Sequence, residues 1–157
     1  MPPPAFLDLD SIDLKHVIVS REEIYEKLPH RFEFMQLDGI LHIDIPHELA
    51  VGFRDIRTDE WWVKGHIPGR PLFPGVLMVE TAAHLASYLS LLLLKQDRFL
   101  GFGGIDATKF REAVVPPSRL YLVCKAIEIK PRRTVCAIQG FVEGRMVLET
   151  RITGMFM

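Results

Sequence analysis

Cysteine is scarce in this 157-residue chain, which has only Cys124 and Cys136. They form neither a CxxC pair nor a zinc-ligand spacing, so we expect two buried thiols in a reducing compartment rather than a disulfide framework. The net charge is only -1, and no basic run is interleaved with aromatic residues, which argues against a nucleic-acid partner. A phosphate-binding loop is also missing, because the glycines at 101–104 lack the following Gly-Lys-Ser/Thr.

Long apolar runs are missing too, with one exception at Val76–Leu94. This stretch is long enough to cross a bilayer, but it contains Glu80 and His84, and charge inside a membrane is costly. We therefore predict a helix buried in a soluble protein, with no membrane span. The chain opens with Met-Pro-Pro-Pro and then acidic residues, unlike a secretory signal, so we expect a cytoplasmic location.

The remaining patterns predict one α+β domain over residues 20–157, preceded by an N-terminal extension at residues 1–19. The triple proline favours an extended, partly disordered arm. Ser20 and Glu23 fit a capping box for a helix at about 21–27, and the Leu28-Pro29 step ends it. Alternating residues predict strands near 37–45, 49–54, 99–105, 120–130, 134–143 and 146–155, with a bend at 103–104 and a linking segment at 106–112. A mainly antiparallel sheet around one long helix follows.

The most informative segment runs from His66 to Glu80, Gly-His-Ile-Pro-Gly-Arg-Pro-Leu-Phe-Pro-Gly-Val-Leu-Met-Val-Glu from residue 65. It joins an imidazole to a carboxylate through a turn rich in proline and glycine, which restricts the backbone, and then enters the apolar helix. A base, an acid and free backbone N–H groups at a helix start can act on a carbonyl substrate.

Three segments carry a resemblance to the 3-hydroxyacyl-(acyl-carrier-protein) dehydratases of the FabZ type, which have the hot-dog fold. Residues 28–34 with Asp38 are similar to the family pattern LPHRxPFxxxD. Residues 66–80 follow HxPGxPxxPGVLxxE with the same spacing, and residues 109–116 resemble the substrate-tunnel strand KFRxPVxPGD. The resemblance covers about residues 20–155, and the second segment is the most specific.

This resemblance implies a sheet wrapped around one hydrophobic helix and removal of water from 3-hydroxyacyl thioesters on acyl carrier protein. Such an elimination needs no metal and no organic cofactor, so we expect neither. It further implies a homodimer or a trimer of dimers, with the histidine and the glutamate of one site supplied by different protomers. Arg70, Lys64, Arg132 and Arg133 could meet an acidic carrier protein, or could equally be solvated surface.

We assign roles from the chemistry that dehydration needs. His66 would be the base for the α-proton, and Glu80 the acid for the β-hydroxyl if burial raises its pKa. The Gly75 N–H would bind the thioester oxygen, with the helix dipole behind it. We expect Pro74, Val76, Phe110 and His84 to bind substrate. Aromatic residues such as Trp62, Phe102 and Phe110 more often fill a core, although one could line the acyl channel.

The chain departs from the family pattern at several positions, among them Glu33, Ile67 and 117–119. The most important is His84, where the family usually has glutamine. A charged His84, one turn from Glu80, would lower the pKa of Glu80 and weaken it as an acid. A neutral His84 could replace the glutamine as an orienting partner, and we favour this form because burial disfavours the cation.

These departures suggest a divergent member, from fatty-acid synthesis or a related polyketide or specialised lipid pathway. A hot-dog thioesterase and a non-catalytic acyl-binding protein remain as alternatives. Chain length and the choice between acyl carrier protein and coenzyme A stay open from sequence. We expect His30 and Arg31 to brace the fold.

Overall fold

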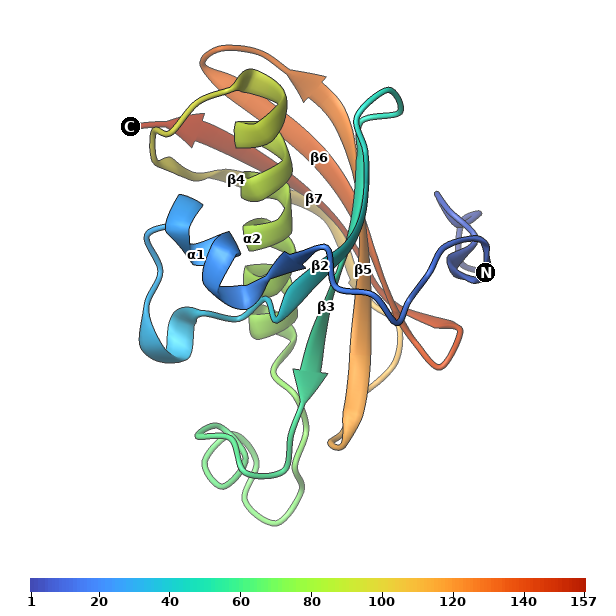
Figure 1. The fold of residues 1–157 in the computed structure, drawn as a ribbon. Coiled ribbons are helices and arrows are strands. Elements are labelled where there is room, and N and C mark those ends of the chain that lie inside the picture. Colours follow the sequence, from blue (N-terminus) through green and yellow to red (C-terminus); the bar gives the residue numbers. More distant parts are fainter.

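A seven-stranded antiparallel sheet wraps around the long helix α2 (Gly75–Leu94) in the computed structural model, which describes all 157 residues (Figure 1). The strand order is β1-β2-β3-β5-β6-β7-β4. The strands are β1 (Val19–Ser20), β2 (Gly39–Asp44), β3 (Leu49–Ile56), β4 (Leu100–Phe110), β5 (Ser118–Ile129), β6 (Arg133–Val142) and β7 (Arg145–Phe156). The predicted α+β architecture is confirmed.

Helix α2 is the centre of the core, and the sheet curves around it (Figure 1). Its buried residues include Met78, Ala82, Leu85 and Leu89, which recur at helical spacing along the side that meets the sheet. By length and composition the helix could cross a membrane, yet most of it is buried inside the domain. The prediction of a buried core helix is therefore confirmed, although the helix begins at Gly75, one residue earlier than predicted.

Helix α1 (Arg21–Lys27) begins at the predicted capping box. The Glu23 backbone N–H donates to the Ser20 hydroxyl at 3.1 Å, and the Ser20 N–H donates to the Glu23 carboxylate at 3.1 Å. The helix ends before Pro29, as the sequence predicts. It brings Tyr25 into the core, where the Tyr25 hydroxyl reaches His84 of α2.

Strand β4 runs further than the sequence predicts. We expected a strand to Ile105 and a linking segment after it, but β4 continues to Phe110. Its pairing with β7 shifts between Phe102 and Gly104, at the predicted bend, and again between Asp106 and Lys109. At these bulges β4 has extra residues relative to β7, and the two strands remain paired on either side. The strand is at the sheet edge, and its apolar side chains Phe102, Ile105 and Phe110 are half-exposed.

The N-terminal extension is packed, which corrects the expectation of a partly disordered arm. It lies on the sheet face opposite α2 (Figure 1) and includes a short 3-10 helix, η1 (Leu9–Ser11). Phe6, Leu7, Leu9 and Ile12 pack against a cluster of Leu49, Val51, Val123 and Phe141. Gln139 ties the arm down by accepting from the Phe6 N–H and donating to the Pro4 carbonyl. Burial of these apolar side chains offsets the entropy of ordering the arm.

The segment from 57 to 74 leads from β3 to α2 and carries His66. It is a series of turns rather than a strand, and two contacts anchor it. Arg54 donates to both carboxylate oxygens of Glu60, at 2.5 and 3.1 Å, with both side chains nearly buried. Trp62 is buried against Phe73, with the ring centroids 5.2 Å apart. Trp62 therefore fills the core, whereas His66 stays on the exposed turn between these anchors.

Candidate active site

His66 presents one ring nitrogen as a proton acceptor. Its Nδ1 lies 2.7 Å from the Leu72 carbonyl oxygen, which can only accept, so Nδ1 carries the proton. In the neutral ring Nε2 then has a free lone pair, as a general base requires. The side chain is exposed beside the start of α2, so substrate can reach it.

The start of α2 lies in the same groove as His66. This groove is lined by His66, Pro74, Gly75, Val76 and Phe110, among others. Pro74 precedes the helix without a side-chain cap, so the first N–H groups of the helix lack a partner from that position. The Phe110 ring lies against Gly75, where an added Cβ would come within 2.9 Å of it. The structure thus places four of the predicted site residues around His66.

Glu80 lies one turn further along α2 and is held by His84. The His84 Nε2 is 2.8 Å from Glu80 Oε2, which confirms that their side chains meet. This hydrogen bond lowers the pKa of the Glu80 carboxyl, outweighing its partial burial. The expectation that burial would raise the pKa of Glu80 was wrong, because a donor lies directly on the carboxylate.

Tyr25 fixes the other nitrogen of His84. Its hydroxyl is 2.7 Å from His84 Nδ1 and accepts from the Leu37 N–H at 2.9 Å. Burial raises the pKa of the Tyr25 phenol well above its usual range, so the hydroxyl keeps its proton. Sequence reasoning missed Tyr25 entirely, since a tyrosine in a short helix carries no signal of a contact 59 residues away.

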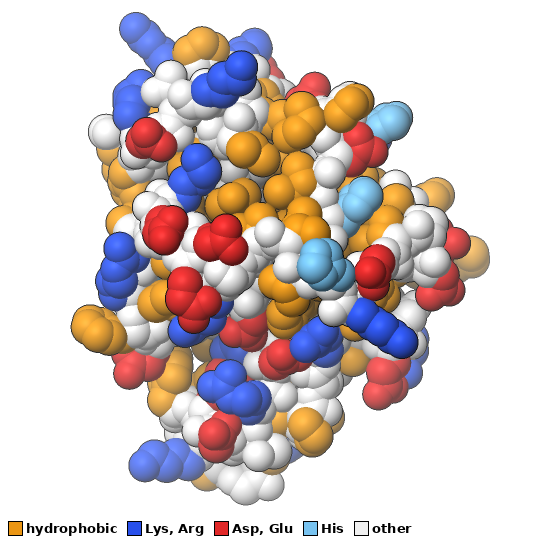
Figure 2. All heavy atoms as spheres, viewed as in Figure 1, with side chains coloured by type: hydrophobic (Ala, Val, Ile, Leu, Met, Phe, Trp, Pro, Cys, Tyr) orange, Lys and Arg blue, Asp and Glu red, His pale blue; other side chains and the backbone are white.

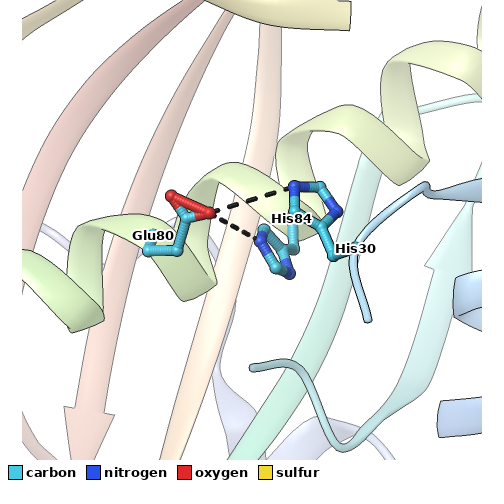
Figure 3. A group of neighbouring side chains, drawn as sticks. All are labelled: His30, Glu80 and His84. Carbon is cyan, nitrogen blue, oxygen red and sulfur yellow. Dashed lines mark hydrogen bonds and ion pairs between the residues drawn. The ribbon is translucent and has the colours of Figure 1, made fainter. Parts of the chain in front are cut away.

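His30 is part of the same cluster rather than only a brace for the fold. Figure 3 shows His30 reaching Glu80 from the segment after α1, with its Nε2 3.9 Å from Glu80 Oε2. Its ring lies 3.9 Å from the His84 ring, tilted by 30°. Burial lowers the pKa of His30 to about 4, so the ring is neutral at pH 7. Arg31 does brace the chain, donating to three backbone carbonyls.

The cluster of His30, Glu80 and His84 could in principle ligate a metal, since one ligand atom of each lies within 4.8 Å of the others. The hydrogen bonds favour a different arrangement. When Nδ1 of His84 accepts a hydrogen bond from the Tyr25 hydroxyl, the neutral ring carries its proton at Nε2. Nε2 is the nitrogen that faces Glu80, and a metal held by both residues would have to bind there. The side chains are therefore arranged for hydrogen bonding to Glu80.

His66 and Glu80 open into different grooves of one chain. Glu80 lies in a groove with Val79, Phe102, Ile105 and Thr108, beneath β4. Val76 and Phe110 line both this groove and the one that holds His66. A second hollow extends from Glu80 past His30 and Ser87 to Phe99 and Leu100, between α2 and the sheet. Glu80 is therefore at the junction of two hollows, and no hydrogen bond joins it to His66.

The surface shows no separation of charge on the face drawn in Figure 2. Acidic and basic side chains are interspersed there, with hydrophobic side chains between them. A single-sign patch of the kind that tracks a nucleic-acid backbone is not seen on this face.

Comparisons with known proteins agree on one family. A family profile described as a FabA-like domain matches residues 28–151. The chain is 34% identical over 135 residues to the 3-hydroxyacyl-(acyl-carrier-protein) dehydratase FabZ of Clostridium novyi, covering 83% of this chain and 92% of that protein. It is also 34% identical over 137 residues to the FabZ of Enterococcus faecalis, covering 85% and 94%.

Solved structures support the hot-dog fold. A dehydratase heterocomplex, ApeI:P from Xenorhabdus doucetiae, matches with a TM-score of 0.73 at 14% identity, over 85% of this chain and 90% of that one. The mutant thioesterase PA1618 from Pseudomonas aeruginosa matches with a TM-score of 0.66 at 14% identity, over 88% and 94%. At such low identity these two similarities bear on the fold alone.

Proposed function

Because this chain belongs to the FabA-like family, alongside the FabZ dehydratases, we propose that it removes water from 3-hydroxyacyl thioesters carried on acyl carrier protein. The products are trans-2-enoyl thioesters of fatty-acid or related lipid or polyketide synthesis. One observation carries the assignment of residues: the hydrogen bond to Leu72 leaves His66 Nε2 free as a base, beside a helix start with free N–H groups.

In this mechanism His66 Nε2 takes the α-proton, and the electrons of that C–H bond form the new double bond. The Gly75 N–H, with the positive end of the α2 dipole behind it, binds the thioester oxygen as charge develops there. Phe110, Pro74 and Val76 form the walls that exclude water around the thioester.

Glu80 acts on the β-hydroxyl as a carboxylate. His84 and His30 both approach Oε2, which leaves Oε1 to accept a hydrogen bond from the hydroxyl. Because its pKa is lowered, Glu80 is ionised at neutral pH and has no proton to give in its resting state. The proton that His66 takes from Cα therefore returns to the departing hydroxyl, forming water and restoring both residues.

The complete site needs a second copy of the chain. In one protomer His66 and Glu80 lie in different grooves, and the edge strand β4 carries half-exposed Phe102, Ile105 and Phe110 between them and solvent. An unpaired apolar edge is a natural pairing surface. We propose that β4 pairs with its copy, giving a homodimer or a trimer of dimers in which His66 of one protomer meets Glu80 of the other.

The decisive experiment measures the ultraviolet absorbance of the enoyl thioester when purified protein hydrates crotonyl and longer 2-enoyl thioesters. We expect His66→Ala and Glu80→Gln each to abolish turnover. Dimers formed by co-expression of both variants should regain about a quarter of the wild-type activity, since half the dimers are mixed and each has one intact site. No recovery in mixed dimers would refute the shared site.

A thioesterase is distinguished in the same reaction by free thiol. We expect no release of thiol from acyl thioesters by wild-type protein. Thiol release that needs His66 and Glu80, without hydration of enoyl thioesters, would replace the dehydratase proposal by the thioesterase alternative. A folded oligomer with neither activity would favour a non-catalytic acyl-binding protein.

The surface near His66 carries two cations that would attract an acidic acyl carrier protein. Lys64 and Arg70 are exposed on the turns that flank His66. An acidic carrier would be attracted to them, mainly through its association rate. Reversing both charges should raise KM for acyl-carrier-protein substrates several-fold and leave KM for short thioester analogues unchanged. Equal KM changes for both substrates would exclude this docking surface.

We place the protein in the cytoplasm. Its two cysteines are buried and unpaired, which suits a reducing compartment, and its proposed carrier-bound substrates are soluble.

A further inference from the structure

We propose that Tyr25 is a positioning residue that keeps His84 neutral, so that Glu80 meets substrate as a carboxylate held by a neutral donor. This inference rests on the proposed function, in which Glu80 accepts a hydrogen bond from the β-hydroxyl. It concerns the residues behind Glu80, which touch the carboxylate or its partner but not the reacting atoms.

The direction of the Tyr25–His84 hydrogen bond follows from its neighbours. The Leu37 backbone N–H can only donate, and it donates to the Tyr25 oxygen at 2.9 Å. The phenol proton must therefore go elsewhere, and the acceptor within reach is His84 Nδ1, at 2.7 Å. A ring that accepts at Nδ1 and is neutral carries its proton at Nε2, where Glu80 Oε2 accepts it at 2.8 Å. The four groups form one directed chain of hydrogen bonds.

A charged His84 would break this chain. With a proton on Nδ1, His84 would have to donate to the Tyr25 oxygen, and the phenol proton would lose its acceptor. His84 is only 1% exposed, so water cannot replace that acceptor without opening the core. Tyr25 therefore adds the cost of an unpaired buried O–H to any protonation of His84.

The charged and titratable groups around His84 explain why the hydrogen bond from Tyr25 matters. Glu80, on the same helix, is anionic and attracts a proton towards His84. His30, which stacks on His84 at 3.9 Å, is neutral at pH 7 and adds no charge. The charge of Arg31 acts on His30, and the charges of Arg21 and Asp38 act in opposite directions on the pKa of Tyr25. Only Tyr25 contacts the nitrogen that an added proton would occupy.

Neutrality of His84 matters for the reaction. A neutral donor holds Glu80 Oε2 in place but leaves Oε1 a stronger acceptor than an adjacent imidazolium would. A cation at His84 would also oppose the positive charge that His66 acquires on taking the α-proton. The pair of Tyr25 and His84 thus orients Glu80 without weakening it.

The first test is nitrogen-15 NMR of histidine-labelled full-length protein at pH 7, which reads the proton on each ring nitrogen without any turnover. Wild-type protein should show His84 protonated at Nε2 only, and Tyr25→Phe should show a rise in the doubly protonated form. The matched control is Tyr88→Phe, a buried tyrosine on α2 whose hydroxyl has no partner in the chain. A doubly protonated His84 in wild-type protein would overturn the proposal.

The second test is the pH dependence of turnover. Tyr25→Phe should lower kcat about fivefold at pH 6, with a smaller loss at pH 8 and KM within about twofold, because a lost hydrogen bond is worth roughly 1 kcal/mol. In a His84→Gln background the neutral amide cannot gain a proton, so this pH dependence should vanish. If it persists there, Tyr25 acts only through the fold.

The two tests separate the inference from the proposed function. Absence of turnover in wild-type protein would refute the dehydratase, while the NMR result would still decide whether Tyr25 controls His84. Loss of the Leu37 hydrogen bond will itself destabilise Tyr25→Phe, so a thermal melt accompanies each measurement. If the variant does not fold, the wild-type NMR spectrum and the pH profile of His84→Gln decide the matter.

Discussion

Arg54 and Glu60 form a buried ion pair at the base of the segment that carries His66. Both side chains are about 5% exposed, and Glu60 also accepts from the Arg57 backbone N–H. Burial works to raise the pKa of Glu60, but the hydrogen bonds from Arg54 and Arg57 leave it lowered. The pair holds the first turn of the segment against the end of β3, and so it sets where His66 can lie.

Breaking this pair should therefore affect both stability and activity. Glu60→Gln keeps the shape but leaves the Arg54 charge buried beside a neutral group, so we expect a loss of about 3 kcal/mol. Urea unfolding measures this loss, and the enoyl hydration assay should show a parallel decrease. The control is Asp59→Asn, whose pair with Arg57 is exposed and should change stability little. Equal effects of the two variants would refute the anchoring role.

Acid should destabilise the protein through His30. Its pKa falls from the ordinary 6.5 to about 4 in the folded state, so between these values the unfolded chain binds the extra proton. Stability should therefore decrease as pH drops from about 6.5 towards 4, by on the order of 1 kcal/mol after allowing for partial exposure of the ring. Denaturant melts across this range measure it. In His30→Asn this component should disappear, and an unchanged slope would contradict the assignment.

The contact of Gly75 with Phe110 should be sensitive to a single methyl group. A Cβ at Gly75 would lie 2.9 Å from the Phe110 ring, which must move away from the helix start. We expect Gly75→Ala to lower kcat/KM about tenfold, or roughly 1.4 kcal/mol. Adding Phe110→Leu should recover part of the loss. Gly65→Ala is the control, because nothing lies within 4 Å of its Cβ position. If Gly75→Ala with Phe110→Leu has the same kcat/KM as Gly75→Ala alone, a steric cause is excluded.

The N-terminal arm should contribute to stability. Removal of residues 1–12 uncovers Val51 and Val123, which are fully buried beneath it. We expect a loss of about 2 kcal/mol and increased binding of a hydrophobic dye. Removal of residues 1–3 alone should have little effect, because it leaves Phe6 and the later apolar residues in place. Unchanged stability of the longer deletion would mean that the arm is not held in solution.

The local features were predictable because their causes are local. The capping box of Ser20 and Glu23 pairs backbone N–H groups at the start of the same helix. The contact of Glu80 with His84 follows from a spacing of one helical turn. The end of β4 was not predictable in this way. The strand continues to Phe110 through bulges in its pairing with β7, and because that pairing is not visible in the sequence of β4 alone, the predicted strand ended too early.

By itself the sequence determined the α+β architecture, the buried α2, and a histidine and a glutamate on either side of a restricted turn, because periodicity and spacing act within a segment. Only the tertiary structure decided the chemical state of Glu80. Tyr25, His30 and Leu37 come from separate parts of the chain, and packing of α1 and the following segment against α2 brings them to His84 and Glu80. Hydrogen bonds there change a pKa in the direction opposite to burial, and no pattern along the chain encodes that balance.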